Sequence, residues 1–235
     1  MGVVFRWGVD RGFLAHNPAA GIAKLERPKK LADANRPWSD EKREAVLTAA
    51  PPPIRACVAL GMFAGCREAD AVGMTWESVG KDGWLRWKMQ KTGDQIAIPI
   101  DPRLAAILDE VKGGIIPHPS LRIVVGMRSG EPYTMDGFRA IFFRLIRKLE
   151  REGKVRDGLT FHGLRHTLGA RLASLGASTK MIQTLLGHHT APMAEHYSRA
   201  YDKRTLAQAA MTLISGNVDS NVYGQEPRPK EPLND

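Results

Sequence analysis

The sequence has few cysteines and no long apolar run, and this argues against disulfide-rich, metal-binding and membrane-spanning proteins. Only two of its 235 residues are cysteines, Cys57 and Cys66, which gives no disulfide framework and no metal-ligand spacing. No apolar run approaches the roughly eighteen residues that a transmembrane helix needs. The first residues run straight into Arg6 and Trp7, so we expect no signal peptide. These absences lead us to expect a cytoplasmic protein with reduced thiols.

Acidic residues are also scarce relative to basic ones. The chain has 34 Lys and Arg against 25 Asp and Glu, which gives a formal net charge of +9. A surplus of this size favours a polyanionic partner, with nucleic acid as the leading candidate. A basic but otherwise ordinary protein is the alternative. Hydrophobic residues make up 43% of the chain, which is enough for a sizeable core.

The residues best suited to chemistry gather between His162 and Tyr197. His162, Arg165 and His166 are spaced to share one face of a helix. Arginine offers a planar fork to phosphate oxygens, histidine moves protons near neutral pH, and tyrosine can act as a covalent nucleophile. The set therefore favours chemistry on a phosphate. Another face of the same helix carries the leucines that we expect to be buried, namely Leu164, Leu168, Leu172 and Leu175.

Three motifs follow one another in this stretch. They are His162-Gly163-Leu164-Arg165, then Leu186-Gly187-His188, then Tyr197, nine residues after His188. In this order and spacing they resemble the C-terminal signature of the tyrosine recombinases, the phage integrase family. The resemblance covers about residues 37–215. Gly163 departs from it, because the family commonly has an aspartate there.

Two residues further upstream fit the same resemblance. Arg67 follows an apolar helix predicted over 54–63, where an arginine needs a partner. From that segment alone a surface pair with Asp70 is an equally good interpretation. Lys91 stands in a predicted hairpin turn, where a lysine is ordinarily just solvated. The family, however, has an arginine followed three residues later by an acidic residue, and a lysine in a Lys-Thr-Gly hairpin.

The resemblance implies that Tyr197 attacks a DNA phosphodiester and forms a 3′-phosphotyrosyl intermediate. Two arginines would stabilise the charge on phosphorus, His162 would accept the tyrosine proton, and Lys91 would protonate the leaving 5′ oxygen. We expect no cofactor, and no metal, because His162 and His166 lack the glutamate of an H-E-x-x-H site. We expect Asp70 and His166 to support the catalytic set, which is Arg67, Lys91, His162, Arg165, His188 and Tyr197.

The expected fold is mainly α (α+β), a helical catalytic domain with a small antiparallel three-stranded sheet. Strands are predicted over 84–89 and 95–100, and a third over 123–125. Helices are predicted from Ser39 to the prolines at 51–53, over 101–112, over 136–150 and over 203–214. We expect residues 1–20 to be the last helix of an N-terminal core-binding domain, 21–36 a basic linker, 37–215 the catalytic domain and 216–235 a disordered tail.

The expected partner is double-stranded DNA, bound by a homotetramer in which the helix at 203–214 docks onto a neighbouring protomer. The basic face of the helix at 136–150 is either solvated or follows phosphates. Two alternatives use similar features: a truncated integrase that binds DNA or a partner recombinase without turnover, and a type IB topoisomerase. Candidate DNA contacts are Lys29, Lys30, Arg36, Arg139 and Arg144.

Overall fold

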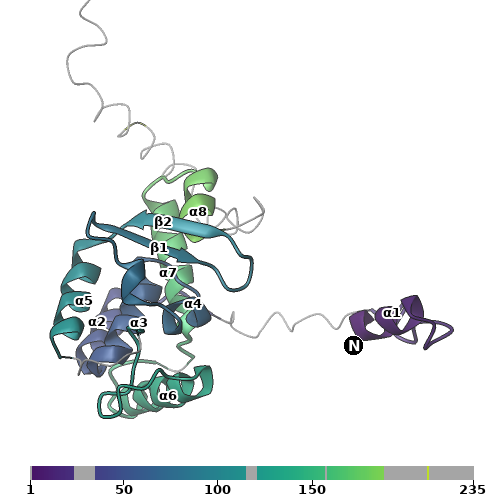
Figure 1. Cartoon of the computed structure of the whole chain (residues 1–235), viewed down its shortest axis with the longest axis horizontal. Coiled ribbons are helices and arrows are strands. Elements are labelled where there is room, and N and C mark those ends of the chain that lie inside the picture. Colours follow the sequence, from purple (N-terminus) through teal and green to yellow (C-terminus); the bar gives the residue numbers. More distant parts are fainter. Residues whose placement is uncertain (1, 24–34, 115–120, 157, 188–210, 212–235) are drawn as a thin grey trace, which may run out of the picture. The chain divides into compact units, whose positions relative to one another are not determined.

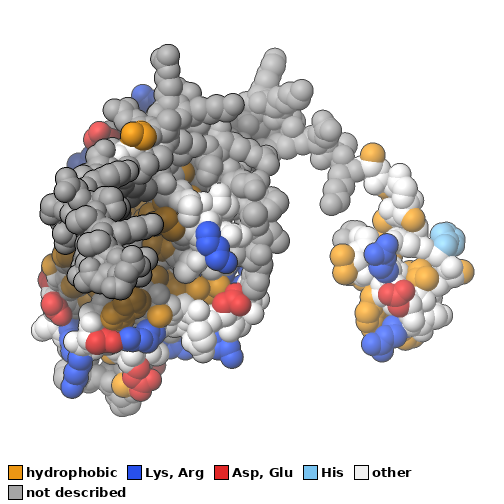
Figure 2. Space-filling view, turned by 90° about the horizontal axis from the view of Figure 1, so that it is seen from above, with side chains coloured by type: hydrophobic (Ala, Val, Ile, Leu, Met, Phe, Trp, Pro, Cys, Tyr) orange, Lys and Arg blue, Asp and Glu red, His pale blue; other side chains and the backbone are white. Residues whose placement is uncertain are grey.

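The computed structural model describes residues 2–23, 35–114, 121–156, 158–187 and 211 (Figure 1). The chain divides into two compact units, Met1–Ala34 and Asn35–Asp235. The smaller unit is built on α1 (Gly2–Asp10), and Trp7 stacks on Phe13 with ring centroids 5.6 Å apart. Val3 and Ile22 stay exposed, and Figure 2 shows hydrophobic side chains at the surface of this unit.

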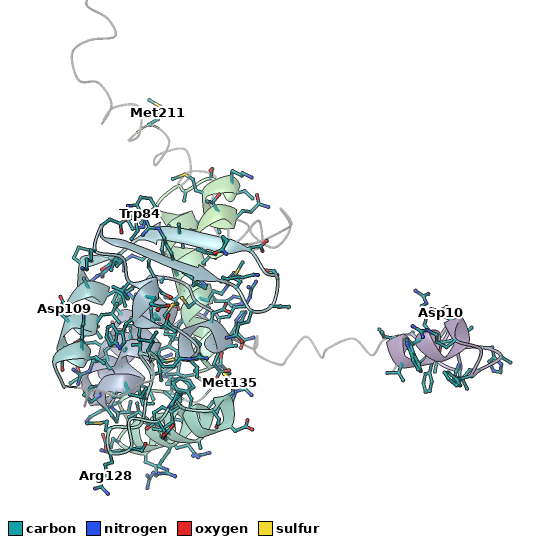
Figure 3. The ribbon with its side chains drawn as sticks, in the orientation of Figure 1. Asp10, Trp84, Asp109, Arg128, Met135 and Met211 are labelled. Atoms are coloured by element: carbon teal, nitrogen blue, oxygen red, sulfur yellow. The ribbon has the colours of Figure 1, made fainter. Side chains whose placement is uncertain are left out.

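The larger unit is organised around one buried helix, α3. The sheet and α8 lie at one end of this unit and α6 at the other (Figure 1). Side chains fill the space between the elements, whereas Arg128 points outward (Figure 3). No helix in the described part of the chain is long and apolar enough to cross a membrane. In chain order the elements are α2 (Asp40–Ala49), α3 (Pro52–Phe63), α4 (Glu68–Val72), the 3₁₀ turn η1 (Trp76–Ser78), β1 (Trp84–Lys88), β2 (Gln95–Pro99), α5 (Pro102–Gly114), α6 (Met135–Arg151), α7 (Phe161–Ser174) and α8 (Thr179–Leu186).

The helix α3 is apolar except for Arg55, and nine of its twelve residues are buried. It begins at Pro52, two residues earlier than predicted, because proline lacks only an N–H that the first turn would leave unpaired. A Cβ atom at Gly61 would lie 2.8 Å from the ring of Phe161. The glycine therefore allows α7 to approach α3 closely.

The sheet is a hairpin in which β1 pairs antiparallel with β2, with Trp87 opposite Ile96 and Leu85 opposite Ile98. These four side chains are buried while the residues between them are exposed, as the strict alternation predicted. The predicted third strand is wrong for the described residues. There the pairing beyond the hairpin consists of isolated bridges at Thr75–Arg122, Val79–Leu85 and Val125–Pro132. Each brings together one residue pair, since the chain turns away on both sides.

Two aromatic contacts of Phe161 and the hydrogen bonds of one tryptophan hold α7 in place. Phe161 at its first position packs edge-on against Phe138 and Phe142 of α6, with centroids 5.8 and 6.1 Å apart. Such pairs contribute about 0.5–1.5 kcal/mol beyond their buried area. Trp38 donates from its backbone N–H to Thr167 Oγ1 at 2.7 Å and from its indole to the carbonyl of Thr160 at 3.1 Å. The helix that carries His162 and Arg165 is thus fixed from two sides.

The predicted leucine stripe of α7 is only partly correct. Leu164 is buried, but Leu168 and Leu172 are partly exposed, and Leu175 is 67% exposed. Besides Phe161 and Leu164, the buried residues of α7 are small ones together with Arg165. The spacing of the leucines did not predict the buried face because Arg165 and Thr167, which are polar, have hydrogen-bond partners inside the protein.

Candidate active site

The turn between α3 and α4 places Arg67 as the N-cap residue of α4. Gly65 in this turn has a φ of 65°, a left-handed conformation that favours glycine. A Cβ atom there would also lie 2.6 Å from Leu186 Cδ2. The turn that carries Arg67 can therefore lie against the end of α8 only because residue 65 has no side chain.

The guanidinium of Arg165 joins this turn to α8. Arg165 is 2% exposed, and its Nη1 donates to the carbonyl of Gly65 at 2.7 Å. Its Nη2 donates to the carbonyl of Leu186, the last residue of α8. One buried side chain thus fixes the position of the Arg67 turn and of the Leu-Gly-His motif relative to α7. A guanidinium suits this task because its donors form a rigid planar fork.

A carboxylate on α4 holds the hairpin that carries Lys91. Asp70 is 5% exposed, and its Oδ1 accepts the backbone N–H of Gln90 at 2.8 Å. The side chain of Gln90 in turn donates to the carbonyl of Ala69 at 2.9 Å. Lys91 follows directly and is exposed in the turn. In the described part of the chain no ion pair joins Arg67 to Asp70, so the alternative interpretation of a simple surface pair is wrong.

The two histidines of α7 lie against each other, with ring centroids 4.9 Å apart for His162 and His166. The pKa of His162 is lowered to about 4, first by desolvation and then by the charges of His166, Arg165, Arg67 and Lys91. Part of the ring is exposed, but every one of these effects acts in the same direction. The imidazole is therefore neutral at pH 7, the state in which it can accept a proton.

The structure brings four of the six candidate catalytic residues to one place, namely Arg67, Lys91, His162 and Arg165. His188 and Tyr197 lie outside the described residues, as do Lys29, Lys30 and all but Met211 of the predicted helix over 203–214. Within the described ranges no cluster of His, Cys, Asp and Glu could hold a metal ion.

The candidate DNA contacts that the structure describes are at the surface. Arg36 and Arg144 are exposed, and Arg139 of α6 forms an ion pair with Glu68, 2.8 Å between Nη2 and Oε2. Glu68 directly follows Arg67, so this pair ties α6 to the start of α4. Figure 2 shows basic side chains standing beside acidic ones on the larger unit.

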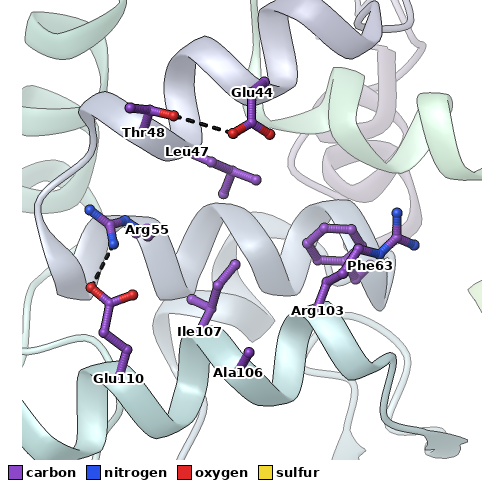
Figure 4. A pocket seen from close by; sticks show the side chains of 9 residues that line it. All are labelled: Glu44, Leu47, Thr48, Arg55, Phe63, Arg103, Ala106, Ile107 and Glu110. Atoms are coloured by element: carbon purple, nitrogen blue, oxygen red, sulfur yellow. Dashed lines mark hydrogen bonds and ion pairs between the residues drawn. The ribbon is translucent and has the colours of Figure 1, made fainter.

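A groove elsewhere on the larger unit holds none of the candidate residues. It lies between α2, α3 and α5, where Arg55 pairs with Glu110 at 2.6 Å and the guanidinium of Arg103 lies 4.6 Å from the ring centre of Phe63 (Figure 4). Its fourth charged side chain, Glu44, accepts a hydrogen bond from Thr48, so each charged group of the groove already has a partner within the protein. The candidate chemistry is instead at the junction of α4, α7, α8 and the hairpin.

Two features of the site were not predicted from the sequence. At Gly163 a Cβ atom would lie 2.7 Å from both the Arg36 carbonyl and Trp38 Nε1, so residues 36–38 can lie this close to α7 because residue 163 has no side chain. Met89 was predicted only as a strand residue, yet its sulfur contacts Arg67. No sequence signal marks either contact, since both partners are distant in the chain.

The comparisons with known proteins identify the family of the chain. The sequence model of the phage integrase family matches residues 39–204. The integrase of Enterobacteria phage 434 is 30% identical over 215 residues, which cover 85% of this chain and 57% of that integrase. The tyrosine recombinase XerC of Xylella fastidiosa is 29% identical over 78% of this chain and 62% of its own length. The chain thus spans less than two thirds of these curated relatives.

Solved structures show the same fold. A lambda integrase dimer bound to a COC′ core site superposes with a TM-score of 0.62 and 28% identity, over 86% of this chain and 59% of that one. The integrase of transposon Tn1549 in complex with circular intermediate DNA gives a TM-score of 0.65 at 18% identity, over 89% of this chain and 75% of that one. The second likeness concerns the fold alone.

Proposed function

Because the chain belongs to the phage integrase family, we propose that it is a site-specific recombinase that cuts and rejoins DNA strands through a 3′-phosphotyrosyl intermediate. The observation that carries the proposal is the position of Arg165. Its guanidinium holds the Arg67 turn and the end of α8 together, while Asp70 on α4 holds the hairpin with Lys91. Three motifs separated in sequence are thereby assembled around one place.

In the proposed reaction the phenol oxygen of Tyr197 attacks the scissile phosphorus, and the bond from phosphorus to the 5′ oxygen breaks. His162, which is neutral at pH 7, accepts the phenol proton, and Lys91 donates a proton to the leaving 5′ oxygen. Arg67, Arg165 and His188 stabilise the negative charge that builds up on the non-bridging oxygens. Attack by another 5′-OH reverses these steps and joins new strands.

Two guanidinium groups would take the part that a metal ion has in other phosphoryl transfers. We therefore propose that cleavage needs no metal and no cofactor. Formation of the covalent adduct in EDTA at the same rate as in Mg²⁺ is the expected result. A rate that falls more than about tenfold in EDTA would contradict this part of the proposal.

The proposed partner is double-stranded DNA, bound by several protomers. Lambda integrase has been solved as a dimer on a core site and as a tetramer on a Holliday junction, and we extend both to this chain. We also propose that residues 203–214 dock onto a neighbouring protomer. Each phosphate contact should add roughly −0.9 to the slope of log affinity against log salt. Arg144→Gln, which removes an exposed cation of α6, should therefore make the slope shallower by about one contact.

The test is incubation of the full chain with nicked suicide duplexes, from which the cleaved fragment diffuses away. The expected product is a covalent protein–DNA adduct, seen as a shifted band under denaturing conditions. Tyr197→Phe should abolish it. Tyr201→Phe, four residues further on, is the matched control and should leave the adduct yield unchanged. An adduct that survives in Tyr197→Phe would show that the nucleophile is another residue, and specific binding without any adduct would favour a DNA-binding protein without turnover.

A further inference from the structure

Met89 lies at the centre of the candidate site although it carries no charge. It follows β1 directly and precedes Gln90 and Lys91, and it is 1% exposed. The thioether sulfur lies 2.8 Å from Arg67 Nη1, which donates to it. Arg67 is one of the two guanidinium groups proposed to bind the scissile phosphate. Among the residues that the structure describes, the hydrogen-bond partner of its side chain is this neutral, polarisable sulfur.

The same side chain contacts the Leu-Gly-His motif. Gly187 ends α8 with a φ of 58°, and a Cβ atom there would lie 2.2 Å from the Met89 methyl carbon and 3.0 Å from its sulfur. The methyl group therefore occupies the space next to the residue that precedes His188. Met89 thus lies between Arg67, the N-cap residue of α4, and Gly187, the C-cap residue of α8.

The backbone of Met89 is fixed as well. Its N–H donates to the carbonyl of Asp94 at 2.9 Å, and its carbonyl accepts the N–H of Gly93 at 2.8 Å. These bonds close the hairpin turn around Lys91, and Asp70 holds Gln90 from the other side. The sulfur consequently has a defined position from which it can orient Arg67.

A thioether has a chemical advantage at this position. A carboxylate would form an ion pair with Arg67 and would compete with a phosphate for the guanidinium. An aliphatic side chain would leave a half-buried N–H without an acceptor, which costs free energy. A methionine sulfur is a weak acceptor, so it directs the guanidinium while leaving its charge for the substrate.

We propose that Met89 is a positioning residue for Arg67: its sulfur orients the guanidinium, and its methyl group sets the distance between the Lys91 hairpin and Gly187. The inference rests on the proposed recombinase function for its effect on the rate, but the contact itself does not depend on turnover. The two can therefore be tested separately.

The contact is tested by NMR on the full chain labelled with ¹³C at the methionine methyl groups. Met89→Leu identifies the Met89 resonance by its loss. Arg67→Lys should move this resonance and leave that of Met74, a core methionine that is 2% exposed, in place. A Met89 resonance that does not move in Arg67→Lys would overturn the inference, whether or not the protein cleaves DNA.

The effect on chemistry is tested by single-turnover cleavage of the suicide duplex. Met89→Leu keeps the volume but removes the acceptor, so cleavage should slow by about tenfold, the effect of one such hydrogen bond. The lost acceptor should lower the melting temperature by only a few degrees, so the variant stays folded in the assay, and DNA affinity should stay as in the parent. Met74→Leu, the same change elsewhere in the core, should cleave at the parent rate.

Two further measurements separate positioning from a general loss of packing. In an Arg67→Lys background, Met89→Leu should slow cleavage by no more than about twofold, because residues that act as a unit are not additive. A methylphosphonate at the scissile position lacks the charge that Arg67 would bind, so the penalty of Met89→Leu should likewise shrink. If Met89→Leu slows cleavage in the Arg67→Lys background and on the methylphosphonate as much as it does in the parent on the normal duplex, the inference is overturned.

The outcomes distinguish the inference from the function. If the parent forms the adduct and Met89→Leu forms it equally fast, Met89 has no positioning role and the recombinase function stands. If the parent forms no adduct on any duplex, the proposed function fails, and the NMR result alone decides whether Met89 orients Arg67.

Discussion

Asp70 accepts the backbone N–H of Gln90 at 2.8 Å and so joins α4 to the hairpin across twenty residues of sequence. Its other oxygen, Oδ2, is buried and has no hydrogen-bond partner within the part of the chain that the structure describes. The bond to Gln90 is therefore the hydrogen bond that this carboxylate contributes in the described part of the chain. It fixes the backbone immediately before Lys91. Asp70 itself stands three residues after Arg67, about one helical turn along the chain.

Asp70→Ala should release the hairpin. Gln90 loses its acceptor, so we expect its amide to exchange with solvent at least about tenfold faster, as a hydrogen bond of this kind is lost. Hydrogen exchange followed by NMR measures this directly. Asp70→Asn keeps an acceptor oxygen and should leave the exchange rate within about threefold of the parent. Equal exchange in Asp70→Ala and the parent would show that other contacts hold the hairpin.

Arg165→Lys should destabilise the larger unit. In Arg165 two separate nitrogens reach the carbonyls of Gly65 and Leu186, whereas the donors of a lysine all radiate from one nitrogen, so we expect Arg165→Lys to lose at least one of the two bonds. A buried carbonyl without a donor costs about 1–3 kcal/mol, and we expect a loss of this size in the free energy of unfolding from urea titrations. Arg171→Lys, an exposed arginine on the same helix, should change it by less than about 0.5 kcal/mol. Similar values for both variants would contradict the bridging role of Arg165.

The pH dependence of stability should carry the signature of His162. Its pKa is lowered from 6.5 to about 4 in the folded chain, so below pH 6.5 the unfolded chain takes up a proton that the folded chain does not. Stability should therefore fall as the pH is lowered from about 6.5 to about 4. In His162→Gln the urea midpoint should depend less on pH within this window. His16→Gln, in the smaller unit, is the control, and an unchanged profile in His162→Gln would argue against the lowered pKa.

Gly163→Ala and Gly113→Ala should have opposite effects, although both residues are helical. At Gly163 the new Cβ atom would lie 2.7 Å from the Arg36 carbonyl and from Trp38 Nε1, so overpacking should cost about 1–3 kcal/mol. At Gly113 of α5 no described atom outside the surrounding turn of the helix lies within 4 Å of the added Cβ, and alanine should stabilise by about 0.5–1 kcal/mol. Thermal unfolding of both variants checks the pair. A neutral Gly163→Ala would mean that residues 36–38 move aside at little cost.

Much of the fold followed from local patterns. The alternation of Ile96 and Ile98 predicted a half-buried strand, and the apolar run over 54–63 predicted a buried helix, because periodicity reports which side chains face the core. The third strand and the buried leucine stripe failed for the opposite reason. A strand forms only where a partner strand pairs with it over several residues, and the sequence of residues 123–125 does not report such a partner. Whether Leu175 is buried likewise depends on which element packs against it, which the spacing of leucines does not report.

For the site, the amino-acid sequence by itself determined which residues are the candidates for chemistry: the spacing of His162, Arg165, His188 and Tyr197 is a property of the chain. It also determined the family, since the motifs are local and in order. Only the tertiary structure decided what holds them, namely Arg165 between two carbonyls, Asp70 on Gln90, and Met89 against Arg67 and Gly187. These contacts join residues 20 to 100 positions apart, and one of them depends on a backbone carbonyl and another on a weak sulfur acceptor. Groups that every residue possesses, or that many share, leave no pattern in a sequence, and their role appears only when folding brings them together.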